Sequence, residues 1–401
     1  MLVKPEEVGL SSERLARVNA WAQRLVDDGK LPGITTAVVR RGKVAHFNVC
    51  GLADMKRETR MAPDTILRFY SMTKPLTSTA IMMLYEEGHF HLDDPITRYL
   101  PCFKDMRVAT GGMRGKVDTV PAERDITFRD LLTHTSGLTY GEGNDGPVAG
   151  LYQRQHTDFA TDDGPLEAVV DRLARIPLLF EPGTAWNYGV SSDVLGRVIE
   201  VASGMPLDRY LGEAVLGPLR MIDTGFRVPP TKLDRVASIY TIGGGSELAP
   251  VDTAAELTIP PERYTLSGGG GLFSTAADYL RFAEMLRRGG RLGETRLLRE
   301  TSVHLMTRNH LQGDLATMAA PSSSDLALEG IGYGFGMSVV VDPARTAMRT
   351  HMGEYGWGGH ASTAFFVDPG NEVTAVFMTQ LIPSGSYPIR SELRSLVADA
   401  L

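Results

Sequence analysis

Residue runs with strong strand-forming tendency gather at the two ends of this sequence, and this distribution limits the folds open to the chain. Strands are expected at 34–40, 44–49 and 65–70 near the amino terminus, and at 334–341, 362–367 and 373–379 near the carboxyl terminus. The segment between them carries short helical patterns broken by proline and glycine. The economical fold is α/β (α+β), with one antiparallel sheet built from both chain termini, flanked by helices, and a mostly helical domain inserted.

This arrangement predicts domains that are discontinuous in sequence. Residues 1–94 and 261–401 would form the α/β sheet domain, and residues 95–260 would form a mostly helical domain with long loops. Helices are expected at the start of the chain, from Ser11 or Ser12 to Gly29, and at its end, over 388–401. Residues 139–165 are rich in glycine and aspartate and are predicted to form a long surface loop.

Composition narrows the class of protein further. Of the 401 residues, 43% are hydrophobic and 22% are charged, which is ordinary for a globular protein. The 41 basic and 48 acidic residues give a net charge of −7, and no basic stretch is dense enough to follow a phosphate backbone. The first residues are charged and lack the apolar run of a signal peptide. We therefore expect a cytoplasmic protein that binds neither nucleic acid nor membrane.

One serine–lysine pair has the spacing that nucleophilic catalysis needs. Lys74 is the only one of eight lysines with a serine three residues before it, namely Ser71. The pair is expected where a strand runs into a helix, so the two side chains would lie one turn apart on one face. A serine hydroxyl needs a neighbouring base to attack a carbonyl, and a desolvated lysine can activate it. On its own, such a pair is more often a capping serine and a surface lysine.

Two further segments supply possible partners for this pair. Tyr188, in Trp186-Asn-Tyr188, follows a Pro-Gly turn and precedes a predicted helix, which is a rigid place for a second base, although a single tyrosine is more often a packed core residue. A glycine-rich strand start, Trp357-Gly358-Gly359-His360, lets a substrate lie against backbone, and its N–H groups can stabilise an oxyanion. By itself it is equally compatible with an ordinary turn.

Taken together and in this order, these motifs resemble those of the serine β-lactamase and penicillin-binding protein superfamily. The set also includes the segments Leu131–Leu138 and Gly268–Gly271, and it extends over nearly the whole chain. Within that superfamily the sequence is most similar to the family VIII carboxylesterases and their acyltransferase relatives, which are themselves similar to class C β-lactamases. The resemblance implies a β-lactamase-like fold with the active site between the two domains and no cofactor or metal.

The resemblance also implies a role for each matching residue. Ser71 would be the acylated nucleophile, Lys74 would keep the proton network poised, and Tyr188 would be the base that takes the serine proton. Tyr188 would then protonate the leaving alcohol and later activate the deacylating water. The backbone N–H groups of Ser71 and His360 would form the oxyanion hole.

Departures from the class C pattern point to an esterase. Tyr188-Gly-Val190 lacks the amide that holds an acylamino side chain, and Trp357-Gly358-Gly359 lacks the cation that binds a carboxylate. Leaving a carboxylate without its partner in a buried site costs several kcal/mol, of the order of a lost charged hydrogen bond. We therefore expect hydrolysis of small or short-acyl esters, with Val190 and the Trp357–Gly359 segment contacting the substrate.

Other functions stay open at this stage. The same acyl-enzyme could pass its acyl group to an alcohol or amine, or the protein could be a weak β-lactamase. A non-catalytic ligand-binding homologue is disfavoured because a binding protein needs no activated nucleophile. The sequence contains no Gly-x-Ser-x-Gly motif of an α/β-hydrolase, and the His89–Asp94 segment lacks the last histidine of a metallo-β-lactamase motif.

His134 is expected to be a buried structural residue, whereas His351 and His360 could line the site. The oligomeric state is not indicated.

Overall fold

The computed structural model describes residues 2–113, 116–245, 247–251, 253, 255–320 and 329–401. Its helices are α1 Ser12–Asp27, α2 Lys74–Glu86, α3 Phe128–Thr133, α4 Pro147–Gln155, α5 Leu166–Leu173, α6 Ser191–Ser203, α7 Leu207–Leu211, α8 Ala276–Arg287, α9 Glu300–Met306, α10 Leu315–Met318 and α11 Ile389–Ala400. Its strands are β1 Gly33–Arg40, β2 Lys43–Asp54, β3 Thr59–Arg60, β4 Leu67–Arg68, β5 Arg107–Met113, β6 Lys116–Pro121, β7 Ile239–Ile242, β8 Leu248–Val251, β9 Phe273–Ser274, β10 Arg291–Leu292, β11 Thr295–Arg296, β12 Ile331–Tyr333, β13 Ser338–Val340, β14 Tyr355–Gly358, β15 Ala364–Asp368, β16 Val373–Met378 and β17 Leu381–Ile382.

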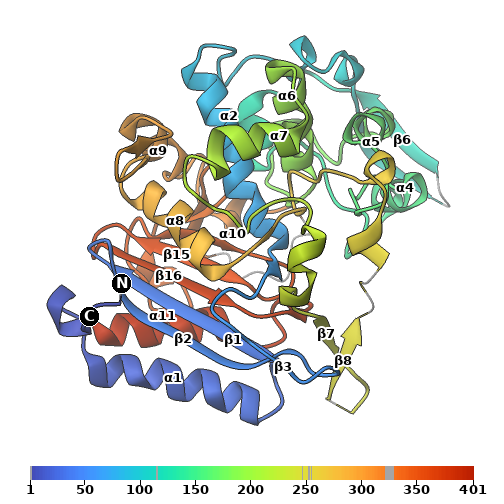
Figure 1. Cartoon of the computed structure of the whole chain (residues 1–401). Coiled ribbons are helices and arrows are strands. Elements are labelled where there is room, and N and C mark those ends of the chain that lie inside the picture. The colour runs from blue at the N-terminus through green and yellow to red at the C-terminus, as the bar shows by residue number, and fades with distance from the viewer. Residues whose placement is uncertain (1, 114–115, 246, 252, 254, 321–328) are drawn as a thin grey trace.

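The main sheet joins the two ends of the chain, as the sequence predicts. Within the described residues it has eight strands in the order β12-β13-β14-β15-β16-β1-β2-β3. The first strand of the chain, β1, pairs with β16 from the carboxyl end in antiparallel register, with Ala37 opposite Val376. Figure 1 shows this meeting of blue and red strands below the helices of the middle of the chain. The predicted antiparallel sheet built from both chain termini is confirmed.

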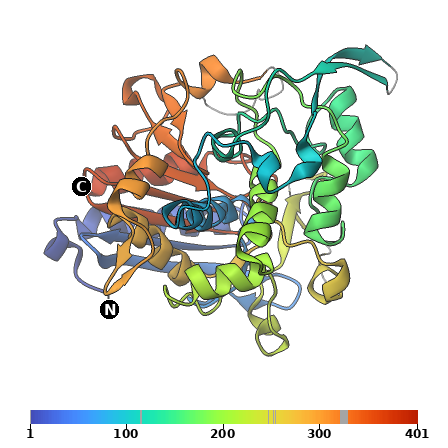
Figure 2. The same cartoon turned by 90° about the horizontal axis from the view of Figure 1, so that it is seen from above.

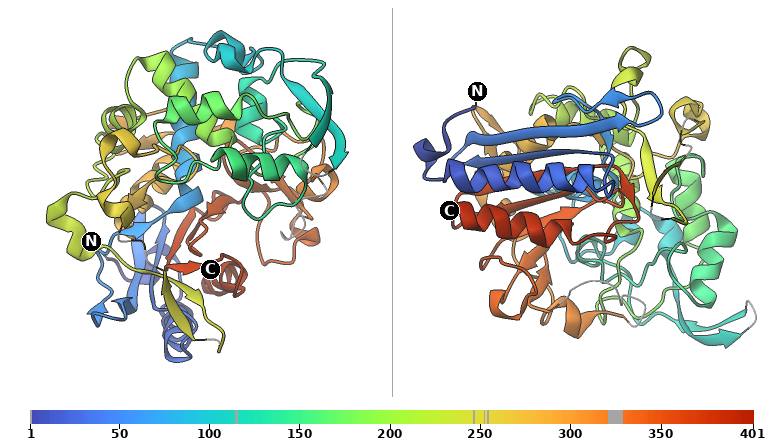
Figure 3. Two further views of the ribbon diagram at one scale, coloured as in Figure 1. Left: turned by 90° about the vertical axis from the view of Figure 1, so that its right-hand side faces the viewer. Right: turned by 90° about the horizontal axis from the view of Figure 1, so that it is seen from below.

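Two terminal helices cover one face of this sheet. Helix α1 begins where the Ser11 hydroxyl accepts a hydrogen bond from the N–H of Arg14, as a capping serine does. It lies beside α11 under the sheet, as Figure 3 shows from the side and from below. The backbone N–H of Ser11 donates to the carbonyl of Ala400 at 3.0 Å, so the two ends of the described chain are close together. A separate apolar cluster that includes Trp21 and Phe377 fills the space between these helices and the sheet.

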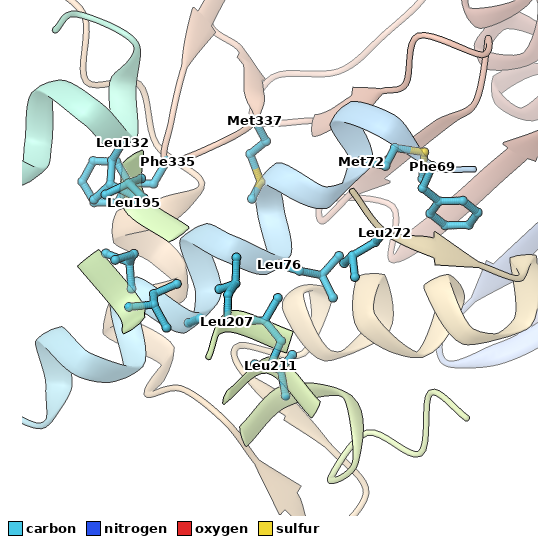
Figure 4. Packing of buried hydrophobic residues seen from close by; sticks show 14 of the residues in the cluster. Phe69, Met72, Leu76, Leu132, Leu195, Leu207, Leu211, Leu272, Phe335 and Met337 are labelled. Atoms are coloured by element: carbon cyan, nitrogen blue, oxygen red, sulfur yellow. The ribbon is translucent and has the colours of Figure 1, made fainter. Parts of the chain in front are cut away.

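The other face of the sheet carries the larger core, with α2 inside it. Most residues of α2 are buried, and the helix contacts α6 and α7 from the middle of the chain. Figure 4 shows Leu76 of α2 beside Leu272, with Leu207 and Leu211 of α7 nearby, and Met72 next to Phe69. Seen from above in Figure 2, the helices of the middle segment stand over one side of the sheet. Among the described residues, no helix is long and apolar enough to cross a bilayer.

The structure differs from the predicted elements in the middle of the chain. Residues 95–260 contain the hairpins β5–β6 and β7–β8, which the sequence reading did not predict. No residue of β6 is buried, so the strand has only a weak apolar pattern. In β5, Gly111 and Gly112 are typical of a loop in sequence, and both adopt positive φ within the strand. The predicted loop over 139–165 contains α4. The strand predicted over 334–341 contains only β13, because residues 334–337 form the turn that joins it to β12. The domain boundaries themselves stay a prediction.

Candidate active site

Ser71 lies in a tight turn directly before α2. The chain leaves β4, forms a 3-10 helix over Tyr70–Thr73, and begins α2 at Lys74. Tyr70 has a positive φ of 44°, a conformation that side chains other than glycine rarely adopt. The Tyr279 hydroxyl donates to the carbonyl of Met72 at 2.9 Å and supports the turn from α8. The sequence predicts one helix starting at Ser71, whereas the structure places the serine in this preceding turn.

The Lys74 ammonium group is buried and has three oxygen acceptors. Its Nζ donates to Ser71 Oγ at 3.2 Å, to the Tyr140 hydroxyl at 3.0 Å and to the Gly269 carbonyl at 2.8 Å. The side chain has no exposed surface. Because an ammonium group has three N–H donors, these contacts satisfy it without a carboxylate. The structure therefore joins the predicted serine–lysine pair to two groups that come from distant parts of the chain.

Tyr188 also contacts Ser71. Its hydroxyl lies 2.6 Å from Ser71 Oγ, and Lys74 Nζ lies 4.6 Å from the centre of its ring. The Trp357 indole N–H donates to the Tyr188 hydroxyl at 3.4 Å, a long hydrogen bond. A short hydrogen bond to the serine beside a cation is the geometry in which a phenol can exchange a proton with a hydroxyl.

The backbone around Tyr188 is fixed by close packing. A Cβ atom at Gly189 would lie 2.7 Å from the Leu138 carbonyl oxygen, so only glycine fits there. The Gly189 N–H donates to His134 Nδ1 at 3.3 Å. Burial, together with the nearby Lys74, holds the pKa of His134 well below its usual range, so the imidazole is neutral. His134 is therefore a buried residue beside the tyrosine, as the sequence predicts.

Tyr140 is a member of this group that the sequence reading missed. It lies 3.0 Å from Lys74 Nζ, and its ring centre is 5.6 Å from that of Tyr188. Burial, followed by the neighbouring Tyr188, raises the pKa of Tyr140 well above its usual range, so it keeps its proton. Its position two residues after the Leu131–Leu138 motif is the only sequence signal that points to it.

Asp193 fixes the backbone of the glycine run, which supplies one of the acceptors of Lys74. Asp193, on α6, accepts hydrogen bonds from Ser267 Oγ at 2.5 Å and from the Gly269 N–H at 2.9 Å. A Cβ atom at Gly269 would lie 2.4 Å from a carboxylate oxygen of Asp193. Burial raises the pKa of Asp193, and the Lys74 charge opposes that shift. The carboxylate thus orients the backbone that presents the Gly269 carbonyl to Lys74.

The segment after β14 lies against the backbone of the nucleophile turn. A Cβ atom at Gly359 would lie 2.2 Å from the Phe69 carbonyl oxygen, and the rings of Tyr70 and His360 are 5.6 Å apart. Among the residues that the structure describes, neither the backbone N–H of Ser71 nor that of His360 donates to another protein group. The structure therefore brings the two predicted oxyanion donors into neighbouring segments and leaves both N–H groups available.

Two predicted contact residues lie elsewhere. The Val190 side chain has no exposed surface and belongs to the main core, so it is not placed to contact a substrate as predicted. His351 forms an ion pair with Asp368 at 2.7 Å, at the end of β15 far from the Gly358–Ala364 pairing that adjoins the site. Among the described residues, His351, Glu354 and Asp368 form the one group spaced like metal ligands, and Glu354 is already paired with Arg394 at 2.6 Å.

Comparisons with known proteins show the family to which the chain belongs. A family model described as Beta-lactamase matches residues 18–399 of the chain. Esterase EstB from Burkholderia gladioli is 32% identical over 407 residues, which cover 95% of this chain and 94% of the esterase. The solved structure of EstCE1, described as a hydrolase with promiscuous acyltransferase activity, superposes with a TM-score of 0.79 at 29% identity, covering 96% of this chain and 98% of its own.

A more distant solved structure shares the fold. A mutant of simvastatin synthase from Aspergillus terreus superposes with a TM-score of 0.81 at 23% identity, covering 98% of each chain. At that identity the likeness concerns the fold alone. The family model matches nearly the whole chain, and the match to the esterase extends over nearly the whole length of both proteins. This chain therefore belongs to the β-lactamase family, and it is a serine hydrolase.

Proposed function

We propose that the protein is a carboxylesterase that hydrolyses small or short-acyl esters through a covalent acyl intermediate on Ser71. The observation that carries this proposal is the pair of contacts on Ser71 Oγ, from the Tyr188 hydroxyl at 2.6 Å and from Lys74 Nζ at 3.2 Å. An attacking serine needs an adjacent base to take its proton, and the Tyr188 oxygen, in its phenolate form beside the Lys74 charge, is placed to be that base. The esterase and hydrolase relatives support the same reaction type.

In the proposed reaction Tyr188 takes up and returns one proton during acylation and another during deacylation. In the reactive form Tyr188 is a phenolate, whose negative charge the adjacent Lys74 ammonium stabilises. Ser71 Oγ attacks the ester carbonyl while its proton passes to this phenolate oxygen. The tetrahedral adduct collapses, the C–O bond to the alcohol breaks, and Tyr188 returns the proton to the leaving oxygen. Water then attacks the acyl-serine with the same tyrosine as base, the bond between the acyl carbon and Ser71 Oγ breaks, and the tyrosine returns the proton to Ser71 Oγ. Tyr140, which keeps its proton, acts as an acceptor for Lys74 and not as the base.

The oxyanion of both tetrahedral adducts would lie between two backbone donors. The N–H groups of Ser71 and His360 are the candidates, because they lie in adjoining segments and make no other hydrogen bond among the described residues. Converging backbone donors stabilise charge that develops on one oxygen, and losing one of them typically costs about 100-fold or more in rate.

The nature of Trp357 favours uncharged substrates. Its indole lies beside Tyr188, with ring centres 5.4 Å apart, and it occupies the position where class C relatives have the cation of a Lys-Thr-Gly motif. The ring is only half-buried, so it can contact a neutral acyl or alcohol group. Since Trp357 also donates to the Tyr188 hydroxyl, its replacement should lower the rate as well as change substrate preference.

Hydrolysis of p-nitrophenyl esters from acetate to octanoate, with a chromogenic cephalosporin in parallel, tests the proposal. We expect turnover of the short esters, little cephalosporin cleavage, and loss of both in Ser71→Ala. A fluorophosphonate probe should label the unaltered protein and not the variant. Ester turnover that survives in Ser71→Ala would refute the proposed nucleophile, and dominant cephalosporin cleavage would refute the assigned substrate class.

Acyl transfer is a second candidate, supported by the description of EstCE1 as a hydrolase with promiscuous acyltransferase activity. Both reactions share the acyl-serine, and only the second nucleophile differs. Adding a primary alcohol or amine to the ester assay should then divert acyl groups into a new ester or amide, which chromatography separates from the free acid. A product consisting of free acid alone at every acceptor concentration would exclude this activity for the acceptors used.

A further inference from the structure

Arg390 lies directly behind the glycine-rich segment of the site. It comes from the first turn of α11, and its Nη2 donates to the carbonyls of Gly359 at 3.0 Å and Thr363 at 3.2 Å. Within the described chain, no carboxylate lies within ion-pair distance of this guanidinium. Burial lowers the pKa of Arg390 to about 10, with a contribution from Arg394, so the group still carries its charge at neutral pH.

The two carbonyls do not need this arginine for hydrogen bonding. The Gly359 oxygen already accepts from the Ser362 N–H at 3.1 Å, and the Thr363 oxygen accepts from the Gly359 N–H at 2.9 Å. A turn closed by these two backbone bonds is complete without a side chain. Placing a cation on it without an anionic partner has a desolvation cost, so the fold alone does not explain the arrangement.

Space for the guanidinium is provided by another glycine. A Cβ atom at Gly358 would lie 2.3 Å from Arg390 Cζ. Gly358, predicted from sequence to contact substrate, therefore has a second role, since it lets the arginine pass behind the strand. Any side chain at Gly358 would therefore displace the guanidinium of Arg390.

The Gly359 carbonyl belongs to the same peptide unit as the His360 N–H. A cation that hydrogen-bonds to a peptide oxygen withdraws electron density from the unit and strengthens the opposite N–H as a donor. The Gly359 oxygen accepts two hydrogen bonds, one from the Ser362 N–H and one from Arg390 Nη2. Its N–H end is the proposed oxyanion donor, and Gly359 lies tightly against Phe69 beside the nucleophile turn.

We propose that Arg390 is a positioning residue that polarises and orients the Gly359–His360 peptide, and so strengthens its N–H as an oxyanion donor. The inference rests on the proposed function, because it assigns Arg390 to the oxyanion hole of the acyl-Ser71 intermediate. It places the origin of part of the catalytic power in the C-terminal helix, outside the motifs that contact Ser71.

The carbonyl stretching band of the acyl-enzyme tests this directly, because a stronger oxyanion donor moves that band to lower wavenumber. The probe is p-nitrophenyl acetate, unlabelled and with a 13C carbonyl, and the difference infrared spectrum isolates the bound carbonyl. In Arg390→Gln we expect the band to move to higher wavenumber and kcat for acetate to fall by about 10-fold, less than the roughly 100-fold cost of losing a donor outright. KM should change little, and Arg390→Lys should restore part of both.

Two further variants separate this effect from damage to the fold. Arg394→Gln removes a buried ion pair one turn later on the same helix, so it should lower the melting temperature without moving the band. Gly358→Ala displaces the guanidinium while leaving the arginine in place, so it should move the band as Arg390→Gln does, even where Arg390→Gln itself fails to fold. An unchanged band and kcat in a folded Arg390→Gln, or an unchanged band in Gly358→Ala, would overturn the inference. If the unaltered protein forms no acyl-serine, the proposed function fails and the inference with it.

Discussion

At the scale of single residues, two tyrosines lie beside Lys74 but make different contacts with the reacting groups. Tyr188 contacts Ser71 Oγ directly, whereas Tyr140 contacts Lys74 Nζ and keeps its proton because burial raises its pKa. The two tyrosines therefore have different proposed roles: Tyr188 exchanges a proton with Ser71, and Tyr140 accepts a hydrogen bond from Lys74.

Replacing each hydroxyl in turn tests this division. Tyr188→Phe removes the proposed base and should lower kcat for p-nitrophenyl acetate by about 100- to 10,000-fold, the range of general base catalysis. Tyr140→Phe leaves Lys74 with two of its acceptors and should lower kcat by roughly 10-fold, since one hydrogen bond to a charged group is lost. Circular dichroism should show both variants folded. Equal losses in the two variants, or normal turnover in Tyr188→Phe, would contradict the assignment.

Lys74 itself gives a prediction of a different kind. Its ammonium is completely buried and satisfied by Ser71, Tyr140 and Gly269. Lys74→Met keeps the length of the side chain and removes the charge and the donors, so turnover should be lost. The melting temperature should change by only a few degrees, because an apolar chain of similar volume replaces a desolvated cation. Retained turnover would exclude a role of this charge in the reaction.

At the scale of elements, the strand pair β1–β2 contains a histidine that couples folding to pH. His46 is 6% exposed, and its Nε2 lies 2.8 Å from the Thr36 hydroxyl on the neighbouring strand. Burial lowers the pKa of His46 from 6.5 to about 4. Since the unfolded chain takes up this proton near pH 6.5 and the folded chain only near pH 4, acid favours unfolding.

The stabilising effect is complete above pH 6.5 and is lost as the pH falls towards 4, with a maximum of about 3 kcal/mol for this residue. His46→Gln keeps a hydrogen-bonding side chain and removes the titration. Urea unfolding at pH 7, 5.5 and 4.5 should give a shallower loss of unfolding free energy in this variant than in the unaltered protein. His91→Gln, at an exposed position, is the matched control and should leave the slope unchanged. Parallel slopes in all three proteins would contradict the assignment.

At the scale of the whole molecule, one core connects the parts that the sequence divides into domains. The main cluster includes Val376 and Phe365 of the sheet, Leu76 and Met82 of α2, and Leu195 of the middle segment. Because α2 is buried between them, neither part can lose the other without exposing this helix (Figure 4).

We therefore expect a single cooperative unfolding transition. Calorimetry should give one peak, with the calorimetric enthalpy equal to the van't Hoff enthalpy, and ester hydrolysis should be lost at the same temperature. A fragment of residues 95–260 should not fold alone, because much of its apolar surface faces α2. Two resolved transitions would show instead that the predicted domains are energetically independent.

The sequence was sufficient for the ends of the chain and for the motifs that carry chemistry. Capping at Ser11, the strand pattern of β1 and β2, and the Ser71–Lys74 spacing are local, so propensity and periodicity reveal them. The same reading missed β5–β6, although the two strands are adjacent in sequence, because β6 has no buried residue and two glycines interrupt β5, so neither strand shows a strong apolar pattern. It also assigned Val190 to the substrate, although this side chain is in the core.

Tertiary structure alone decided which groups surround the reacting atoms. Tyr140, Gly269 and Arg390 lie 66, 195 and 316 positions beyond Lys74 in sequence, and only the packing of α2 and α11 against the sheet and the middle segment brings them to the site. Side-chain identity records what a residue can donate or accept, and this much the sequence determines. Distance, burial and the resulting electrostatics depend on the whole fold, because they are set by neighbours that are remote along the chain.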